Sequence, residues 1–520
     1  MKSEMLGVSA MVDLENPASI GTKSKWIVAV LVGLTFAACY FRSFVFPNIP
    51  VLLWGDQLGA ATDASRMLAG QLPYRDYFEL LTPGSELVYA SLFKVFGVSL
   101  WIPNLTMACM AAATTFFMTL CVRYIVPGPL VALPSLLFVG FVLYGSLDAM
   151  HHWFSTVVIM ASMLILLKGA TYRRVAAAGA LCGVAASFTQ SKGAAAVMAL
   201  LVYIAFTSLH HSPKAVEVWR KCLLLCATSL AVFAAINAHF ILAAGLNRWI
   251  DSVIIFPIRY YPSVSINNWR GTWPDFQGRT GGLKWLCFPF MYCVTPLTYI
   301  AVLWTMRRRG RANRSEVSDR LLLVILIGIA MLVAIAPALS IKRLSSVSPP
   351  AMVLLAWLLS RPGKRLAVAA GTLAAVSLAI ALAMVARTQT RPWAYLDLPA
   401  GRVAIADPAV YEEYRWTAEH TQPGQMYFGM PTMYVPLRLQ NPAPIQAPAP
   451  SEYTRPEQIA AVIEALQTNR VRMLILRPSM YIPHLLGYPS DHLQMFQDYL
   501  YRNYHQTTTF LTGDEVWERF

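Results

Sequence analysis

A segment between the first two apolar runs of the chain concentrates acidic side chains. It holds Asp56, Asp63, Asp76 and Glu79 against only two arginines. A carboxylate held beside a membrane can act as a general base on a hydroxyl group, which would make this segment a catalytic loop. The alternatives are a solvated connector, or a helix for which Asp56 is merely the N-cap, an interaction worth about 1 kcal/mol.

Basic residues at the ends of apolar runs form a second group of candidates. Lys192 lies between two short apolar runs, and Lys342 with Arg343 precedes a late one. Ionisable residues at membrane depth are functional hypotheses by default. The alternative for Lys192 is a side chain that snorkels to the lipid headgroups. Arg259 lies among aromatic residues at 256–262, where the alternative to a binding role is an arginine–aromatic stack.

A third group surrounds a short polar stretch between two apolar runs. Asp148 is either a second functional acid, which orients a sugar or assists Asp56, or a residue that caps the next span. His151 and His152 are adjacent and would face different directions on a helix, so we do not expect a two-histidine metal site. A divalent metal is not expected to be obligatory, because the acidic segment lacks a closely spaced triplet of acids.

The elements that position these residues must be membrane helices. Of the 520 residues, 56% are hydrophobic and only 13% are charged, whereas soluble proteins carry about 25% charged residues. The mean hydropathy is +0.49. We therefore predict a multi-spanning α-helical membrane protein. The expected spans are about 26–46, 100–122, 125–147, 153–168, 175–190, 194–209, 222–245, 284–306, 321–339, 345–360 and 366–386.

The net charge of +15 is distributed as in a membrane protein rather than a nucleic-acid-binding one. Basic clusters end the apolar runs at 171–174, 219–221, 307–314 and 361–365. Lysine and arginine hold such loops in the cytoplasm, where anionic lipids are their partners. This predicts a cytoplasmic segment 1–25, an uncleaved first span and a transmembrane domain over 26–386 in a bacterial inner membrane. The loops 47–99 and 246–283 and the tail 387–520 then lie on the periplasmic or extracellular side.

The extramembrane parts have predicted structure of their own. Residues 56–68 are compatible with a helix that lies flat on the membrane, with Leu58, Ala61, Leu68 and Ala69 on an apolar side. The tail alternates short apolar strands with helical stretches, which indicates a small α/β domain. Its predicted strands are 401–407, 424–430 and 471–477, and its predicted helices are 408–420 and 456–469. The tail has no cysteine, so no disulfide framework is expected there.

The acidic segment resembles the first external loop of the GT-C glycosyltransferases that use polyprenyl-phosphate sugars, such as protein O-mannosyltransferases and the lipid A aminoarabinose transferase. The matching parts are Asp56 and the sequences SRML (65–68), PYRDYFELLTPG (73–84) and LFKVFG (92–97). FTQSKG (188–193) and the stretch 340–359 are also similar to family features. Gln57 departs from the pattern, because many relatives have a glutamate there.

The resemblance implies an inverting hexosyl- or pentosyltransferase that moves a monosaccharide from a polyprenyl phosphate to a hydroxyl on a lipid, glycan or protein. It makes Asp56 the general base. Lys192, Lys342, Arg343 and Arg259 are then expected to bind the donor phosphate.

We expect Asp148, Tyr74, Arg75, Asp76 and Glu79 to contact the acceptor or the sugar, although Arg75–Asp76 can equally be a surface ion pair of little energetic worth. No nucleotide-binding glycine loop and no serine-hydrolase elbow is present. The alternatives to an enzyme are a transporter or flippase of lipid-linked saccharides, and an assembly protein whose tail binds partners.

Overall fold

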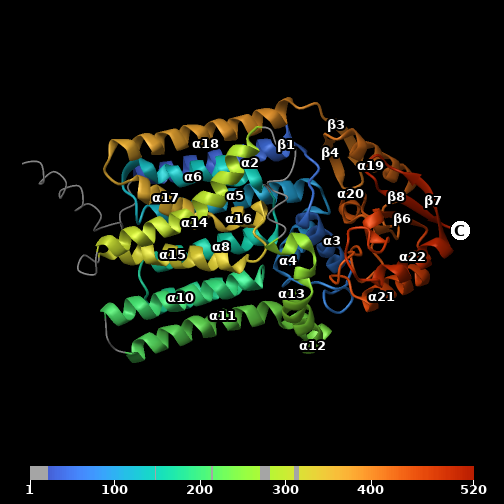
Figure 1. Ribbon diagram of the computed structural model, residues 1–520, viewed down its shortest axis with the longest axis horizontal. Helices are drawn as coiled ribbons and strands as arrows, with labels where there is room; N and C mark the ends of the chain where they lie inside the picture. The colour runs from blue at the N-terminus through green and yellow to red at the C-terminus, as the bar shows by residue number, and fades with distance from the viewer. Residues whose placement is uncertain (1–21, 147, 212–214, 270–281, 310–314) are drawn as a thin grey trace, which may run out of the picture.

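The structure is a computed structural model that describes residues 22–146, 148–211, 215–269, 282–309 and 315–520. A bundle of roughly parallel and antiparallel helices forms one end of the molecule, and the C-terminal domain forms the other (Figure 1). The helices α3 (Asp56–Leu68) and α4 (Gly84–Phe96) lie between these two parts.

The helical bundle confirms the predicted fold class. Among the described residues, eight helical segments have the length and hydropathy needed to cross a membrane. They are α2 (Thr22–Ser43), α5 (Trp101–Val122), the run Gly128–Gly145, α10 (Gln190–His211), α11 (Ala215–Ala244), α14 (Lys284–Arg309), α15 (Glu316–Ala334) and α18 (Lys364–Thr390). Three shorter helices, α8 (His151–Leu167), α9 (Tyr172–Ala186) and α17 (Pro349–Leu359), complete the eleven predicted apolar segments.

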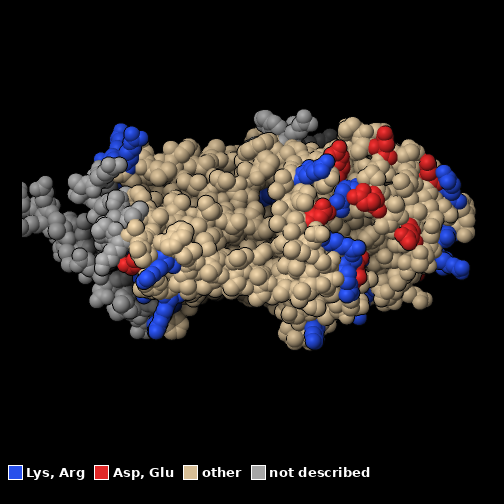
Figure 2. Space-filling model, turned by 90° about the horizontal axis from the view of Figure 1, so that it is seen from below, with Lys and Arg blue, Asp and Glu red and all other residues tan. Residues whose placement is uncertain are grey.

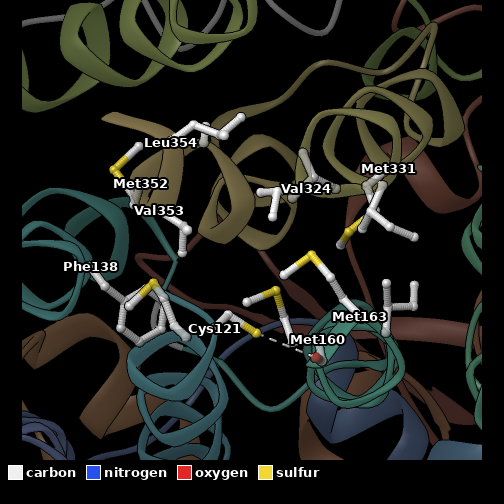
Figure 3. Close-up of a cluster of buried hydrophobic side chains, with 14 of the residues drawn as sticks. Cys121, Phe138, Met160, Met163, Val324, Met331, Met352, Val353 and Leu354 are labelled. Atoms are coloured by element: carbon white, nitrogen blue, oxygen red, sulfur yellow. Dashed lines mark hydrogen bonds between the residues drawn. The ribbon is translucent and has the colours of Figure 1, made fainter. Parts of the chain in front are cut away.

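The short helices have a physical explanation in their packing. Nearly all of α17 is buried, and α8 packs against α5, α9 and α15. Figure 3 shows flexible sulfur-containing side chains filling the space between these helices, with Met160 and Met163 of α8 close to Val324 of α15. Methionine suits such irregular gaps because its side chain is unbranched. A helix enclosed by protein need not span the lipid by itself.

Charged side chains on the surface avoid the middle of the face shown in Figure 2. The face in Figure 2 shows lysine, arginine and acidic residues gathered at the two ends, with an almost uncharged band between them. Such a band is what a bilayer requires, because a charge at its centre costs several kcal/mol. The arginines that end α14 and the Lys364–Arg365 pair that begins α18 lie at the end of the bundle that is remote from the C-terminal domain, whereas Arg387 lies in the last turn of α18, near that domain (Figure 1).

The C-terminal domain is a mixed α/β structure, as predicted. It has a hairpin and a four-stranded sheet of order β5-β6-β8-β7, in which β5 and β6 are parallel and the other pairs are antiparallel. Its strands are β3 (Ala394–Leu398), β4 (Gly401–Ile405), β5 (Phe428–Gly429), β6 (Met473–Leu476), β7 (Tyr504–Thr509) and β8 (Glu515–Arg519). Its main helices are α19 (Pro408–His420), α21 (Pro456–Thr468) and α22 (His492–Asn503).

The central strand β6 connects the two sides of this domain. Leu474 and Leu476 face a hydrophobic cluster formed with α21 and α22. Met473 and Ile475 face a second cluster, which includes residues of α3 and α4. Successive side chains of a strand point to opposite faces, so one strand serves both clusters. The acidic segment therefore shares a hydrophobic core with the tail.

The segment 246–283, predicted as a loop, is partly helical. It contains α12 (Leu246–Ile250), a π-helical turn, α13 (Phe256–Arg259) and two short 3₁₀ turns up to Asn267. Phe256 packs against Phe78 and Tyr453, and Asp251 pairs with Arg455 at 3.1 Å. These contacts fasten the segment to both the acidic segment and the tail.

Candidate functional site

Asp56 is the first residue of α3, and the predicted helix over 56–68 is observed. The N-cap is Gly55, with φ of 102° and ψ of −160°, and no side chain caps the helix. The interpretation of Asp56 as the N-cap is therefore wrong. The carboxylate is exposed, and within the described parts of the chain it forms no recorded hydrogen bond or ion pair. A base that must accept a substrate proton needs such a free carboxylate.

The environment of α3 differs from the membrane-surface helix that was expected. Leu58 and Ala61 are buried, and Ala61 and Ala64 join the hydrophobic cluster that contains Ile475 of the C-terminal domain. Leu68, expected on the same apolar side, is exposed instead. The apolar side of α3 therefore faces protein rather than lipid.

Lys342, from a distant part of the sequence, lies near the start of α3. It is the second residue of α16 (Ile341–Val347), and it is exposed. Its Nζ lies 3.6 Å from the position that a Cβ would occupy on Gly55. The absence of a side chain on Gly55, next to Asp56, leaves this space open. A cation therefore lies close to the residue that precedes Asp56, and no ion pair between the described residues Lys342 and Asp56 is present.

Asp148 lies within electrostatic range of both groups. It is 7% exposed, and it accepts a hydrogen bond of 3.0 Å from Ser146, which in turn accepts one from Trp153. Burial raises the pKa of Asp148 to about 6, against the opposing effects of Ser146 and of the positive charge of Lys342. The charge of Asp56 raises it further.

Arg343 holds the next position of α16 and connects it to the segment after α13. One terminal nitrogen donates hydrogen bonds to the Tyr261 hydroxyl and, at 2.8 Å, to the Asn267 side-chain oxygen. The other, Nη1, is buried without a partner in the described parts of the chain. Burial raises the pKa of Tyr261, and Arg343 opposes that effect. Arg343 therefore has one buried nitrogen whose N–H groups no oxygen of the described residues satisfies.

Lys192 is completely buried inside the bundle. Its ammonium group donates to the His152 carbonyl at 3.1 Å, the Thr156 hydroxyl at 3.3 Å and the Ser346 hydroxyl at 2.8 Å. Ser346 donates to the carbonyl of Arg343 at 2.7 Å. The interpretation as a snorkelling lysine is wrong, because protein rather than headgroups surrounds the charge. These three hydrogen bonds connect α10, which carries Lys192, to α8 and to α16, which carries Arg343.

The remaining predicted contacts are engaged within the protein. Tyr74 is buried beside Phe240, and its hydroxyl donates to the Leu81 carbonyl. Arg75 and Asp76 form a two-pronged ion pair with distances of 3.0 and 2.7 Å, which is the structural alternative considered for them.

Arg259 and Glu79 also have local partners. Arg259 is exposed at the end of α13, with its guanidinium 5.3 Å from the Tyr260 ring. This geometry is the arginine–aromatic contact that was its alternative. Glu79 accepts a hydrogen bond of 2.8 Å from the Leu81 amide, and burial raises its pKa.

The sequence did not reveal that Asp63 is a buried carboxyl group. It is 2% exposed, it accepts a hydrogen bond of 2.8 Å from Gln446, and it contacts the carboxyl group of Glu79. Burial and the charge of Glu79 raise the pKa of Asp63. A third acid, Glu86, is buried nearby, and burial raises its pKa too. Nothing in the local sequence distinguishes these buried acids from solvated ones.

The described residues contain no group of three or more histidine, cysteine or acidic side chains suited to a metal ion. Neither a protein-family model nor a curated protein sequence matches the chain. Solved structures match its fold over nearly the whole chain.

ArnT from Cupriavidus metallidurans, solved with undecaprenyl phosphate, matches with a TM-score of 0.60 and 12% identity, over 95% of this chain and 98% of that one. The oligosaccharyltransferase AglB from Archaeoglobus fulgidus, in complex with a peptide and a dolichol phosphate, matches with a TM-score of 0.54 and 11% identity, over 96% and 75%. The mycobacterial arabinofuranosyltransferase AftD matches with a TM-score of 0.51 and 14% identity, over 95% and 40%. The chain thus has the fold of the GT-C glycosyltransferases.

Proposed function

We propose that the protein is a membrane glycosyltransferase that moves a monosaccharide from a polyprenyl-phosphate donor to a hydroxyl acceptor on the external side of the membrane. The observation that carries the proposal is the exposed, unpaired carboxylate of Asp56 at the N-terminus of α3, with the cation Lys342 close to the preceding Gly55. The fold shared with ArnT and AglB, which were solved with polyprenyl phosphates, supports the donor class.

Each group has a distinct part in the proposed reaction. The acceptor oxygen attacks the anomeric carbon, the bond from that carbon to the phosphate oxygen breaks, and Asp56 takes the hydroxyl proton. Negative charge develops on the leaving phosphate. The exposed ammonium of Lys342 and the guanidinium charge of Arg343 beside it stabilise this charge. A direct displacement of this kind inverts the anomeric centre.

Asp148 and Lys192 position these groups and do not contact the substrate themselves. Asp148 lies close enough to Lys342 for the two charges to interact, and it orients the cation. Lys192 fixes Ser346, and through it the backbone of Arg343. We therefore assign Lys192 to positioning rather than to direct phosphate contact, because it has no exposed surface. Tyr74 and the pair Arg75–Asp76 shape the acidic segment.

The test is a sugar-transfer assay with purified protein and synthetic polyprenyl-phosphate sugars. Asp56→Asn should lower kcat about 10²–10⁴-fold, the usual contribution of a general base. Asp397→Asn is the matched control, because Asp397 is an exposed carboxylate in a loose ion pair at 3.9 Å and should leave transfer unchanged. Full activity of Asp56→Asn would remove Asp56 as the base. Lipid translocation without transfer from any donor would favour the flippase alternative.

A further inference from the structure

A cavity lies between α3 and the C-terminal domain. Its volume is about 210 Å³, room for roughly seven waters, which suits a single sugar ring rather than a polymer. Thr62, Ser65, Arg66 and Ala69 line it from α3, and their spacing of three and four places them on one helix face. The opposite wall comes from residues 426–441 of the C-terminal domain, including Arg438.

This cavity is separate from the Asp56 end of the helix. The face formed by residues 62, 65, 66 and 69 is turned about 120° from the face that carries Asp56 and Asp63. Arg66 also lies ten residues after Asp56, which is about 15 Å along the helix axis at 1.5 Å per residue. A ligand in the cavity therefore does not occupy the place of the reacting atoms.

Arg66 brings a buried positive charge to the wall of the cavity; it forms no direct ion pair in the described parts of the chain, although the charges of Asp63 and Asp76 act on it. It is 7% exposed, and its guanidinium lies 4.3 Å from the centre of the Tyr77 ring. Its Nε donates to Gln71 at 2.6 Å and Nη2 donates to the Ala443 carbonyl at 3.0 Å. Nη1 is buried and has no hydrogen-bond partner among the described residues. Such an orphan donor on a buried cation is costly unless an anion meets it.

Arg438 supplies a second cation to the same cavity. It ends the short helix α20 (Tyr434–Leu437) in a left-handed conformation, with φ of 52°. This conformation is uncommon outside glycine. One guanidinium nitrogen donates to the Val98 carbonyl at 3.0 Å, and the side chain is exposed. The geometry thus places two guanidinium groups around one space, with Gln71, Gln440 and Asn441 as uncharged polar neighbours.

We propose that this cavity binds the phosphate or carboxylate group of an anionic saccharide. Guanidinium groups bind such oxyanions through paired hydrogen bonds, and the amide side chains can bind sugar hydroxyls. The saccharide is the remote part of the glycosyl acceptor, an assignment that rests on the proposed function. The anion site itself does not depend on that function.

The test measures binding to the purified full-length protein by calorimetry. The probes are glucose 6-phosphate, glucuronic acid, inorganic phosphate and uncharged glucose. We expect either charged sugar to bind at least tenfold more tightly than glucose, and more weakly at high salt. Comparison of glucose 6-phosphate with glucuronic acid tells whether the site prefers a phosphate or a carboxylate. Equal binding of glucose, or no binding of any charged probe, would overturn the proposal.

Three variants locate the binding. We expect the affinity for the charged probe to fall at least tenfold in each of the variants Arg66→Gln, Arg438→Gln and Ala69→Phe. Ala69 is exposed and lines the cavity, so a phenylalanine there obstructs it without altering either arginine. The Arg438→Gln and Ala69→Phe variants still test the site if Arg66→Gln fails to fold. Arg402→Gln, an exposed arginine in the same domain, is the control. Unchanged affinity in the Arg438 and Ala69 variants would refute the site.

Transfer assays separate this proposal from the proposed function. Asp56→Asn should bind the charged sugars with unchanged affinity, because the cavity is on another face of α3. If no transfer occurs with any donor although the anion still binds, only the proposed function fails. If transfer proceeds but the wild type binds no charged probe, only the anion site fails.

Discussion

Replacement of Lys192 by methionine separates a structural role of this buried charge from a functional one. The change removes three hydrogen bonds that the charged ammonium group donates, each worth about 1.5–3 kcal/mol. It also removes the desolvation penalty of a buried ammonium, which is several kcal/mol. These contributions nearly cancel, so we expect the free energy of unfolding to change by no more than about 2 kcal/mol.

The polar groups around Lys192 keep other partners in this variant. The His152 carbonyl still accepts from Ser155 at 3.0 Å and from Thr156 at 2.8 Å. The Ser346 hydroxyl still donates to the Arg343 carbonyl. Methionine therefore leaves none of these groups without a hydrogen bond, which is the usual cause of a large loss of stability.

The activity of Lys192→Met should nevertheless fall. Ser346 loses the bond that fixes it, and the turn that carries Lys342 and Arg343 becomes less well placed. We expect kcat/KM to fall about tenfold or more, equivalent to about 1.4 kcal/mol of transition-state stabilisation. The assay is sugar transfer together with thermal unfolding in detergent. Ser191→Ala, an exposed neighbour on α10, should change neither.

A double-variant cycle tests whether Lys192 acts through Arg343. If it does, Lys192→Met combined with Arg343→Gln should lose no more activity than Arg343→Gln alone. Strictly additive losses would show that Lys192 acts independently. A loss of more than about 3 kcal/mol of stability, or unchanged transfer in the stable single variant, would refute the reasoning.

Two further predictions concern packing and pH. Glu413 is 2% exposed, and burial with the charge of Asp514 raises its pKa to about 7 from the usual 4.5, so the folded state keeps a proton that the unfolded chain releases. The stability of wild type relative to Glu413→Gln should thus fall by about 3 kcal/mol between pH 4.5 and 7 in thermal melts, and a constant difference would contradict this. Gly84→Ala should lower the unfolding temperature by the equivalent of about 1–3 kcal/mol, because its Cβ would lie 2.4 Å from the Ser187 carbonyl oxygen. Gly371→Ala, which meets no atom within 4 Å, is the control and should not destabilise.

The sequence is most informative where structure is local. The helix over 56–68 follows from its residues, and α19 and α21 each begin with a proline, Pro408 and Pro456, which suits a first helical turn. The strands β7 and β8 went unpredicted because both carry many polar residues. Half-exposed strands give a weaker pattern than the fully buried β6.

The candidate site was predictable only in part, because its geometry depends on distant segments. Asp56 could be singled out by its position after the first span. That Lys342 reaches Gly55 depends on how α16 packs, which no local pattern encodes. Nothing in the sequence around Asp63 shows that it is buried, yet it is 2% exposed and accepts a hydrogen bond from Gln446 of the C-terminal domain. Lys192 was singled out for its depth, but its partners on α8 and α16 could not be known.

The shared cluster of α3, α4 and β6 has a consequence for biosynthesis. Ala61 and Ala64 pack with Met473 and Ile475, so the helix that begins with Asp56 cannot complete its core until the tail has been made. At about 5–20 residues per second, the ribosome adds the intervening segment in roughly 20–80 s. During that time the nascent chain exposes an unfinished apolar helix face. Premature termination before β6 would therefore yield a membrane-inserted bundle without an assembled α3, a ready substrate for quality-control proteases.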